Sequence, residues 1–456
     1  MQVHPPLPTN GQNWSRMKIL GLFDSMTTTS GFAKVASNIM KRLAAMGATI
    51  DVWGIAYVGL KYKEHPYINT FFPAGTGAHH DHWAGSDRLS LFLGQLQAGG
   101  YTHVWIMQDT FQLVNFDFPA VLRRICTEKK IRSMYYFPVD APLEPNWTDI
   151  IAAVDVAVAY TEYGAEEARG KLAERKAELS ANLPLDAQPD FKGLNYDIPV
   201  HHLPHGVDTK VYQPLDERAE RRQKFWATPF AGPDDFLMIN VNVNQRRKDV
   251  ARSLEVLQAV RELGVPAKLV MHMQAVSDDG LNLEAVGRQL GLKLGEEWQH
   301  HNGLFVRGQG KMSESDLVGF YNIADLYLTT TLGEGWGLGI TEALACGTPV
   351  AMPYHTSCAE ILDFVAERGM ADMVVDLPTE LYGLVQGFDN SRYRQRVDVE
   401  QAARAIHAYW QSGKWKNRTG LSAPVREWLN WNRIAREMLT LWKVGKKVEQ
   451  PVEEAA

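Results

Sequence analysis

Short apolar runs and longer amphipathic stretches alternate along most of the chain. In the first half, runs rich in β-branched and aromatic residues predict strands over residues 17–23, 49–55, 102–107, 131–137 and 154–159. A stretch with helical period begins near Phe32 and ends at about Met46, where Gly47 stops it. In the second half, strands are predicted over residues 236–243, 268–273, 303–308 and 325–330. This order of strand, loop and helix is typical of parallel α/β architecture.

The length of the chain allows more than one core. At 456 residues, two domains can each bury a core of their own. We expect an N-terminal Rossmann-like domain over residues 1–206, a C-terminal Rossmann-like domain over 207–415, and a helical tail over 416–456. In the tail, one face at helical spacing carries large apolar side chains, which predicts a packing helix or, alternatively, a membrane-surface or partner helix. These side chains are Trp428, Trp431, Ile434, Met438 and Trp442.

The most informative stretch is residues 329–361, which predicts a strand, a glycine loop, a helix and a second strand. Its glycines let the backbone approach a ligand, and the amides that open the helix near Leu338 favour a phosphate or diphosphate. Glu334 lies in the loop and Glu342 lies one turn inside the helix. Their carboxylates need neutral hydrogen-bond donors, and sugar hydroxyls are suitable donors of that kind. The combination indicates a nucleotide sugar. The other interpretation is a glycine-rich connection with two solvated glutamates.

This string resembles the EGFG…EAxAxGxPV signature of family 4 glycosyltransferases. The matching residues are Glu334, Gly335, Gly337, Leu338, Glu342, Ala343, Ala345, Gly347, Thr348, Pro349 and Val350. The resemblance implies a GT-B fold, with two Rossmann-like domains facing across a cleft and the C-terminal helix returning to the first. It also implies that Glu334 approaches the transferred sugar as a catalytic residue and that Glu342 holds the nucleotide ribose. Gly335, Trp336, Gly337 and Leu338 would line the donor site.

A basic turn follows the first strand of the second domain. Arg247 and Lys248 suit a diphosphate, since a planar guanidinium and a flexible ammonium are complementary donors; a solvated basic turn is the alternative. Lys248 matches the phosphate-binding lysine of the family. Relatives often have an arginine where this chain reads Asn-Val-Asn at 242–244, so Arg246 or Arg247 would replace it. Arg307 ends the predicted strand 303–308, where relatives hold the nucleotide base.

Polar residues also follow the strands of the first domain, at the edge where parallel sheets bind ligands. Ser30 is a helix cap, and the resemblance places Gly31 and Phe32 at the site. Asp109 follows a second strand. Asp140, where relatives carry a histidine, accepts a hydrogen bond from a sugar hydroxyl or acts as an acceptor-side base, unless it is a turn aspartate beside a proline. His205 belongs to a segment, 202–208, that resembles the family's crossing between domains, and we expect it near the acceptor.

Composition restricts the partners. The net charge of −6 gives no sign of a nucleic-acid partner. Cys126, Cys346 and Cys358 have no paired spacing, and the polar stretch 79–82 (His-His-Asp-His) has no further ligand set, so we expect no metal and no disulfide. Residues 1–15 lack the features of a signal peptide and no run is long and apolar enough to span a membrane, which predicts a cytoplasmic protein. We expect a monomer or a weak homo-oligomer.

The sequence therefore predicts a retaining glycosyltransferase. It would move a hexose-type sugar from a nucleotide-diphosphate donor, which is a substrate and not a cofactor, to an unidentified acceptor hydroxyl. One alternative is a catalytically silent nucleotide-sugar-binding scaffold of the same fold, which residues 242–244 and Asp140 favour because they depart from the family pattern. Another is a nucleotide-sugar epimerase or hydrolase. The acceptor class stays open among lipid, polysaccharide, small molecule, protein and modified nucleic acid.

Overall fold

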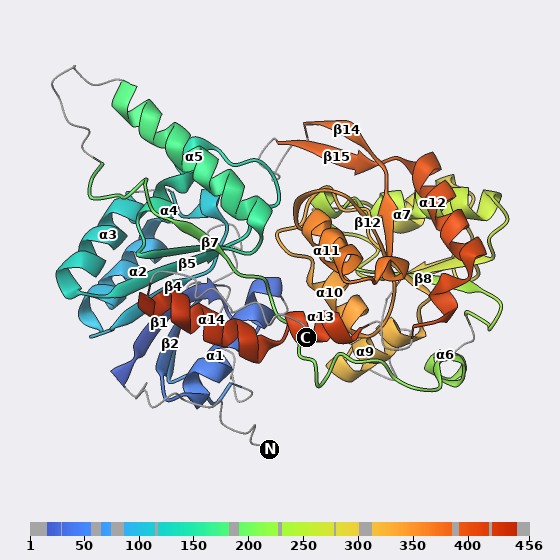
Figure 1. Ribbon diagram of the computed structural model, residues 1–456, viewed down its shortest axis with the longest axis horizontal. Coiled ribbons are helices and arrows are strands. Elements are labelled where there is room, and N and C mark those ends of the chain that lie inside the picture. The colour runs from blue at the N-terminus through green and yellow to red at the C-terminus, as the bar shows by residue number, and fades with distance from the viewer. Residues whose placement is uncertain are drawn as a thin grey trace, which may run out of the picture. The chain divides into compact units, whose positions relative to one another are not determined.

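The chain forms two compact α/β units, each described here by itself (Figure 1). Unit 1 contains residues up to Gly206 and, again, those from Trp431 onward, whereas unit 2 contains Val207–Asn430. A computed structural model describes residues 16–28, 30–55, 65–73, 86–114, 117–181, 191–226, 230–277, 280–300, 312–384, 392–418 and 422–444.

In the described part of unit 1, seven parallel strands form a sheet of order β3-β2-β1-β4-β5-β6-β7. The strands are β1 (Lys18–Asp24), β2 (Thr49–Ile55), β3 (Thr70–Pro73), β4 (His103–Ile106), β5 (Arg132–Phe137), β6 (Val156–Ala159) and β7 (Val200–His202). The central strands are buried along their length, which is why they read as continuous apolar runs without alternation. The strands predicted over 17–23, 49–55, 102–107, 131–137 and 154–159 are confirmed.

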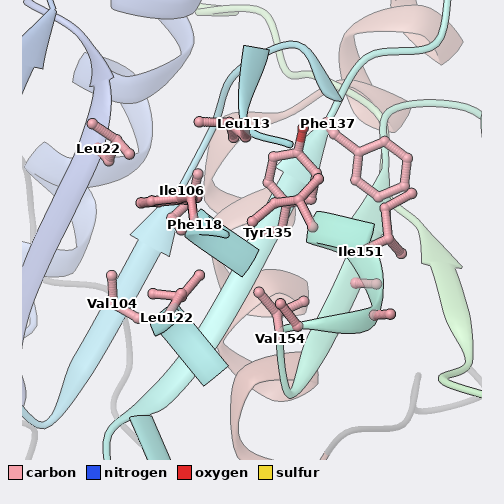
Figure 2. Packing of buried hydrophobic residues seen from close by; sticks show 14 of the residues in the cluster. Leu22, Val104, Ile106, Leu113, Phe118, Leu122, Tyr135, Phe137, Ile151 and Val154 are labelled. Carbon is pink, nitrogen blue, oxygen red and sulfur yellow. The ribbon is translucent and has the colours of Figure 1, made fainter. Parts of the chain in front are cut away.

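Helices cover this sheet. They are α1 (Gly31–Ala45), α2 (Ser86–Ala98), α3 (Phe118–Lys129), α4 (Asp149–Ala152), α5 (Glu162–Ala181) and α14 (Trp431–Val444), with the short 3-10 turns η3 (Thr110–Gln112) and η4 (Pro145–Thr148). Figure 2 shows how the core closes: Leu22, Ile106 and Tyr135 from three strands pack against Phe118 and Leu122 of α3. The predicted helix from Phe32 to Met46 is α1, and it begins one residue earlier.

The C-terminal helix α14 completes unit 1, although it comes last in the chain. The Trp442 ring lies 5.1 Å from the His103 ring of β4, and Arg132 Nε donates to the Trp442 carbonyl at 3.0 Å. Arg42 Nε of α1 donates to Asn432 Oδ1 at 2.8 Å. The helix thus returns to the first domain, as the resemblance implies.

The predicted start of this returning segment at residue 416 is wrong. Residues 416–430 belong to unit 2, where the Trp428 ring stacks on Phe364 at 3.5 Å between ring centres. The helical face from Trp428 to Trp442 is in fact split between α13 (Ala423–Trp428) and α14, because the chain leaves its helical path at Leu429 and Asn430. A shared spacing of aromatic residues cannot reveal such a break.

In the described part of unit 2, six parallel strands form a sheet of order β10-β9-β8-β11-β12-β13. These are β8 (Phe236–Val241), β9 (Ala267–His272), β10 (Trp298–His300), β11 (Leu326–Leu328), β12 (Val350–Pro353) and β13 (Val374–Leu377), beside an antiparallel hairpin of β14 (Thr379–Leu384) and β15 (Tyr393–Val397). The strand predicted over 303–308 lies outside the described residues. The sequence reading missed β10, whose three residues are too few to show a pattern.

The helices of unit 2 alternate with its strands. They are α6 (Arg218–Phe225), α7 (Val250–Glu262), α8 (Leu283–Gln289), α9 (Glu314–Ile323), α10 (Leu338–Ala345), α11 (Thr356–Glu367), α12 (Val399–Ser412) and α13, with the 3-10 turns η5 (Arg246–Lys248), η6 (Ala371–Met373) and η7 (Lys414–Lys416). In both sheets the strand order reverses once, between β1 and β4 and between β8 and β11. Ligands of doubly wound sheets bind beside the carboxyl ends of the strands at that reversal.

Because the partly exposed Trp428 stacks on Phe364 within unit 2, we expect Trp428→Ala to lower the free energy of unfolding by about 1 to 3 kcal/mol. In a double-mutant cycle with Phe364→Ala, the two losses should fall short of additivity by about 1 kcal/mol. Denaturant unfolding measures both. Leu381→Ala, at a side chain 77% exposed, should change the value by less than about 0.5 kcal/mol. Additive losses would show that the two rings do not contact each other.

Candidate functional site

The loops at the strand reversal of unit 2 bring three charged side chains together. Lys248, from the turn η5 after β8, places Nζ 2.6 Å from both carboxylate oxygens of Glu334, which lies in the loop after β11. The Arg247 guanidinium is 3.7 Å from the same carboxylate and donates to the Gly333 carbonyl. The Lys248 and Glu334 side chains are only 13% and 7% exposed. Two cations therefore lie beside one carboxylate.

Backbone and hydroxyl contacts fix these loops. The Leu332 amide donates to the Arg247 carbonyl at 2.8 Å, and the Thr330 hydroxyl donates to the Asp249 carbonyl at 2.9 Å, so the two loops are joined directly. On the other side, the Glu334 amide donates to the Thr356 hydroxyl of α11 at 3.1 Å. The position of the Glu334 carboxylate is therefore set by both neighbouring loops.

Gly337 and Gly339 are needed for different structural reasons. Gly337 has φ +90°, a left-handed conformation that favours glycine, and directly precedes α10. A Cβ on Gly339 would lie 2.6 Å from the Tyr327 hydroxyl and 3.1 Å from the Val241 carbonyl, so this glycine lets α10 pack closely on the strands. As a result, the amides that open α10 lie beside the ends of β8 and β11. Gly335 in this loop and Leu338, the first residue of α10, are partly exposed.

Glu342 lies inside α10 and is buried. Its Oε2 accepts a hydrogen bond from the Tyr321 hydroxyl of α9 at 3.0 Å. Burial, and then the nearby Glu342 carboxylate, raise the pKa of Tyr321 well above its ordinary value, so the tyrosine stays a neutral donor. The sequence reading did not single out Tyr321, because nothing in its helical surroundings marks it.

Other predicted donor residues differ in their surroundings. The Trp336 ring is buried and lies 5.8 Å from the Trp428 ring, so its indole is part of the core and only its backbone is left for donor binding. Arg246 is exposed, whereas Arg247 contacts the glycine loop. Arg307 lies outside the described residues.

The expected arginine near residue 243 is replaced by a structural asparagine. The Asn244 side chain is buried, and its Nδ2 donates to the carbonyls of Gln274, Ala275 and Leu281 at 2.7 to 3.2 Å. This amide therefore ties down the segment after β9. Among the basic residues of the turn, Arg247 is the one that contacts the glycine loop and Glu334.

In unit 1, the carboxyl ends of β1 and β4 form a second polar group. Asp24 ends β1, and its Oδ1 accepts from Gln108 Nε2 at 3.1 Å. Burial raises the pKa of Asp24, and hydrogen bonds from Ser30 and Gln108 partly offset this rise. Ser30 also caps α1, since its hydroxyl accepts from the Ala33 amide at 3.1 Å, as predicted.

The remaining predicted residues of unit 1 lie at the same edge of the sheet. Gly31 is exposed and Phe32 partly buried at the start of α1. Asp109 follows β4 and accepts from Gln112 Nε2 at 3.3 Å, and Asp140, also partly buried, lies in the loop after β5. The edge therefore combines carboxylates, hydroxyls and an amide.

His205 is a buried residue of this unit. Its Nδ1 is 2.7 Å from the Tyr136 hydroxyl, and its ring lies 4.0 Å from the ring of Tyr160. Burial lowers the pKa of His205 to about 3, so the imidazole is neutral at physiological pH. It cannot act there as a cationic group toward an acceptor.

Within the described residues, no three His, Cys, Asp or Glu side chains lie close enough together to hold a metal ion. The His-rich stretch 79–82 is not among those residues. No helix in the described part of the chain is both long enough and apolar enough to cross a membrane.

Comparison with solved structures identifies the class of fold. A glycosyltransferase of Rickettsia africae superposes with a TM-score of 0.62 at 12% identity, covering 94% of this chain and 98% of that chain. The Anabaena protein HepE, in complex with UDP, gives 0.61 at 12% identity, covering 93% and 99%. At such identities the likeness concerns the fold alone. The fold is that of the GT-B glycosyltransferases, with two Rossmann-like units.

Sequence comparison matches one segment of unit 2 to a described family. Residues 222–363 match the family described as glycosyl transferases group 1, so the chain carries a domain of that group. The GDP-mannose-dependent alpha-(1-6)-phosphatidylinositol dimannoside mannosyltransferase of Mycobacterium tuberculosis is 29% identical over 161 residues, which are 35% of this chain and 37% of that protein. The alignment thus spans little more than a third of that relative.

The low pKa of His205 predicts how the free energy of unfolding depends on pH. Between pH 6.5 and about 3, the unfolded chain binds a proton at His205 that the folded chain does not bind. The contribution of the neutral His205 to the free energy of unfolding is therefore complete above pH 6.5 and is lost as the pH falls. We expect the stability difference between the parent and His205→Gln to decrease by about 1.4 kcal/mol per pH unit below pH 6.5.

Denaturant unfolding at pH 7, 6 and 5 measures this difference, in which the other titrating groups cancel. His407→Gln, on the partly exposed side of α12, controls for the loss of an imidazole. A difference that does not change with pH would contradict the prediction.

Proposed function

We propose that the protein is a retaining glycosyltransferase that moves a hexose-type sugar from a nucleotide-diphosphate donor to an acceptor hydroxyl. One observation carries this proposal. Lys248 and Arg247 meet Glu334 in front of α10, at the strand reversal of the second sheet. Cations, helix amides and a carboxylate are the groups that a diphosphate joined to a sugar requires.

Donor binding uses the two cations beside Glu334. The Lys248 ammonium has three donors, so it can keep one hydrogen bond to Glu334 while another reaches a phosphate oxygen. Arg247 and the first amides of α10 supply further donors to the diphosphate. The Glu334 carboxylate is then left to accept from a hydroxyl of the transferred sugar.

Glu342 suits the ribose. One of its carboxylate oxygens accepts from Tyr321, which orients the group, and a ribose hydroxyl would be a second donor. A carboxylate in a buried position needs such neutral donors, because burial without partners is costly.

In the reaction, the bond between the anomeric carbon and the diphosphate oxygen breaks, and its electron pair leaves with the diphosphate. The acceptor oxygen forms the new bond to the anomeric carbon on the same face. The acceptor proton passes to the departing diphosphate or to an acceptor-side base, for which Asp140 is the candidate in unit 1. Lys248, Arg247 and the α10 amides stabilise the charge that develops on the leaving group.

The second candidate is a nucleotide-sugar-binding subunit without turnover. The observation that favours it is the structural use of Asn244, which leaves no arginine at the position where relatives often carry one. Donor binding is common to both functions, whereas transfer to an acceptor belongs only to the first.

We expect one nucleotide sugar to stabilise the protein against heat, by about 2.7 kcal/mol at one hundred times its dissociation constant. Thermal shift against GDP-, UDP-, ADP- and dTDP-sugars measures this. Glu342→Ala should abolish the shift, whereas Glu400→Ala, on the exposed surface of α12, should retain it. No shift with any of the four bases would contradict donor binding.

Lys248→Met should lower kcat/KM for sugar transfer by about 10²- to 10³-fold, because one donor to the developing charge is lost. Lys224→Met is the matched control, since that side chain is 73% exposed on α6. Product analysis with a radiolabelled donor measures transfer, and a melting curve confirms folding. Turnover of Lys248→Met equal to that of the parent would refute the role of this residue.

A further inference from the structure

The hairpin of β14 and β15 contacts both loops of the candidate donor site. It forms a two-stranded sheet of its own beside the six-stranded sheet of unit 2 (Figure 1). Arg394 of β15 is buried, and its Nη1 donates to the Leu332 carbonyl of the glycine loop at 3.4 Å. Arg396 follows two residues later, on the same side of the strand, and pairs with Asp249, the residue directly after Lys248. The sequence reading singled out neither arginine, because the hairpin shows no ligand-binding pattern.

Asp249 joins the basic turn η5 to helix α7. Its φ of +41° lies in the left-handed region, which a residue other than glycine adopts at a cost and keeps only where its surroundings hold it there. Its amide donates to the Arg246 carbonyl at 3.0 Å, which closes the turn around Arg247 and Lys248. The direction in which the Lys248 side chain leaves the backbone therefore depends on the conformation of Asp249.

The Asp249 carboxylate faces the hairpin and not its own helix. An aspartate at the start of a helix ordinarily accepts from an amide of the first turn, but Asp249 makes no such capping bond within the described residues. Its two oxygens instead accept from Arg396, with Nε–Oδ2 at 2.5 Å and Nη2–Oδ1 at 3.0 Å. The Asp249 and Arg396 side chains are 11% and 22% exposed. A bidentate pair fixes the planes of both groups, so Arg396 supplies a contact that holds Asp249 in its left-handed conformation.

The position of the hairpin is itself fixed by α7. Arg252 follows Asp249 by three residues, and its Nε donates to the Val397 carbonyl of β15 at 2.8 Å. Its Nη2 lies 3.0 Å from Glu380 Oε1 of β14. Both strands of the hairpin are therefore tied to the helix that Asp249 precedes. A continuous set of contacts thus runs from α7 through the hairpin to the turn that carries the two cations.

We propose that Arg396 is a positioning residue for donor binding, which through Asp249 holds the basic turn so that Lys248 and Arg247 reach a diphosphate. This inference rests on the proposed function and adds a residue that acts through Asp249 and not by contact with the ligand. Without the Arg396 guanidinium, the Asp249 carboxylate loses its bidentate partner in a poorly solvated place, and the left-handed backbone loses a support. The turn should then relax, which separates Lys248 from Glu334.

The first test compares ligands that do and do not carry a second phosphate. Isothermal titration of the full-length protein with GDP, UDP and ADP, and with the corresponding monophosphates, measures both affinities. For the diphosphate that the parent binds, Arg396→Met should raise the dissociation constant about tenfold, and that of the matching monophosphate by less than about twofold, because the displaced cations face the diphosphate. Arg396→Lys, which keeps a charged hydrogen bond but not the bidentate geometry, should recover part of the loss.

Two controls separate positioning from folding. Arg404→Met, on α12 with a side chain 69% exposed, removes a surface guanidinium and should change neither constant. In a double-mutant cycle, Arg396→Met should add little to the loss already caused by Lys248→Met, because it acts through that ammonium. An Arg396→Met variant that weakens monophosphate and diphosphate equally, or that weakens the diphosphate by the full factor in the Lys248→Met background, would contradict the proposal.

A second test needs no nucleotide. Lys248 Nζ lies 2.6 Å from both Glu334 oxygens and its side chain is 13% exposed, so it should react slowly with acetic anhydride. Mass spectrometry measures its labelling relative to Lys224, whose side chain is 73% exposed on α6. Arg396→Met should raise this ratio at least about threefold, because a released turn opens the ion pair to the reagent. A melting curve confirms that each variant folds, and Arg396→Lys carries both tests if the methionine variant does not.

The outcomes also separate this inference from the proposed function. A parent that binds none of the diphosphates, with Lys248 labelling raised in Arg396→Met, would contradict donor binding and keep Arg396 as a residue that holds the turn. Diphosphate affinity and Lys248 labelling that both stay parent-like in Arg396→Met would keep donor binding and overturn the role of Arg396.

Discussion

The ion pair between Lys248 and Glu334 is the contact on which the second unit's site depends. Each side chain comes from a different loop, and both are largely withdrawn from solvent, so removing either would leave an uncompensated charge in a poorly solvated place. The pair also fixes the distance between the turn after β8 and the start of α10. With the backbone bond from Leu332 to Arg247, it keeps the amides, the cations and the carboxylate in one arrangement before any ligand arrives.

The two units present opposite electrostatic characters at equivalent places in their sheets. At the strand reversal of unit 2 two cations lie beside one carboxylate, whereas at that of unit 1 the Asp24 carboxylate accepts from the neutral Gln108 amide. The common architecture fixes only where a ligand lies, and the loops decide its chemistry.

Much of this arrangement could be predicted from the sequence. The strands with long apolar runs, the cap at Ser30 and the glycine loop before α10 all depend on local chemistry that neighbouring residues display. The pairing of Lys248 with Glu334, the bond from Tyr321 to Glu342 and the burial of Trp336 depend on segments far apart in the chain, and no local pattern reveals them. The division of one aromatic stripe between α13 and α14 was missed for the same reason.

The late position of α14 in the chain has a consequence for biosynthesis. Unit 2 lies between the two parts of unit 1, so all of its residues leave the ribosome before the helix that covers β4 and β5 has been made. During synthesis, the apolar surface of unit 1 that receives Ile434, Met438 and Trp442 stays uncovered until α14 has been made. The first core can therefore close only after all of unit 2 and α14 have been synthesised.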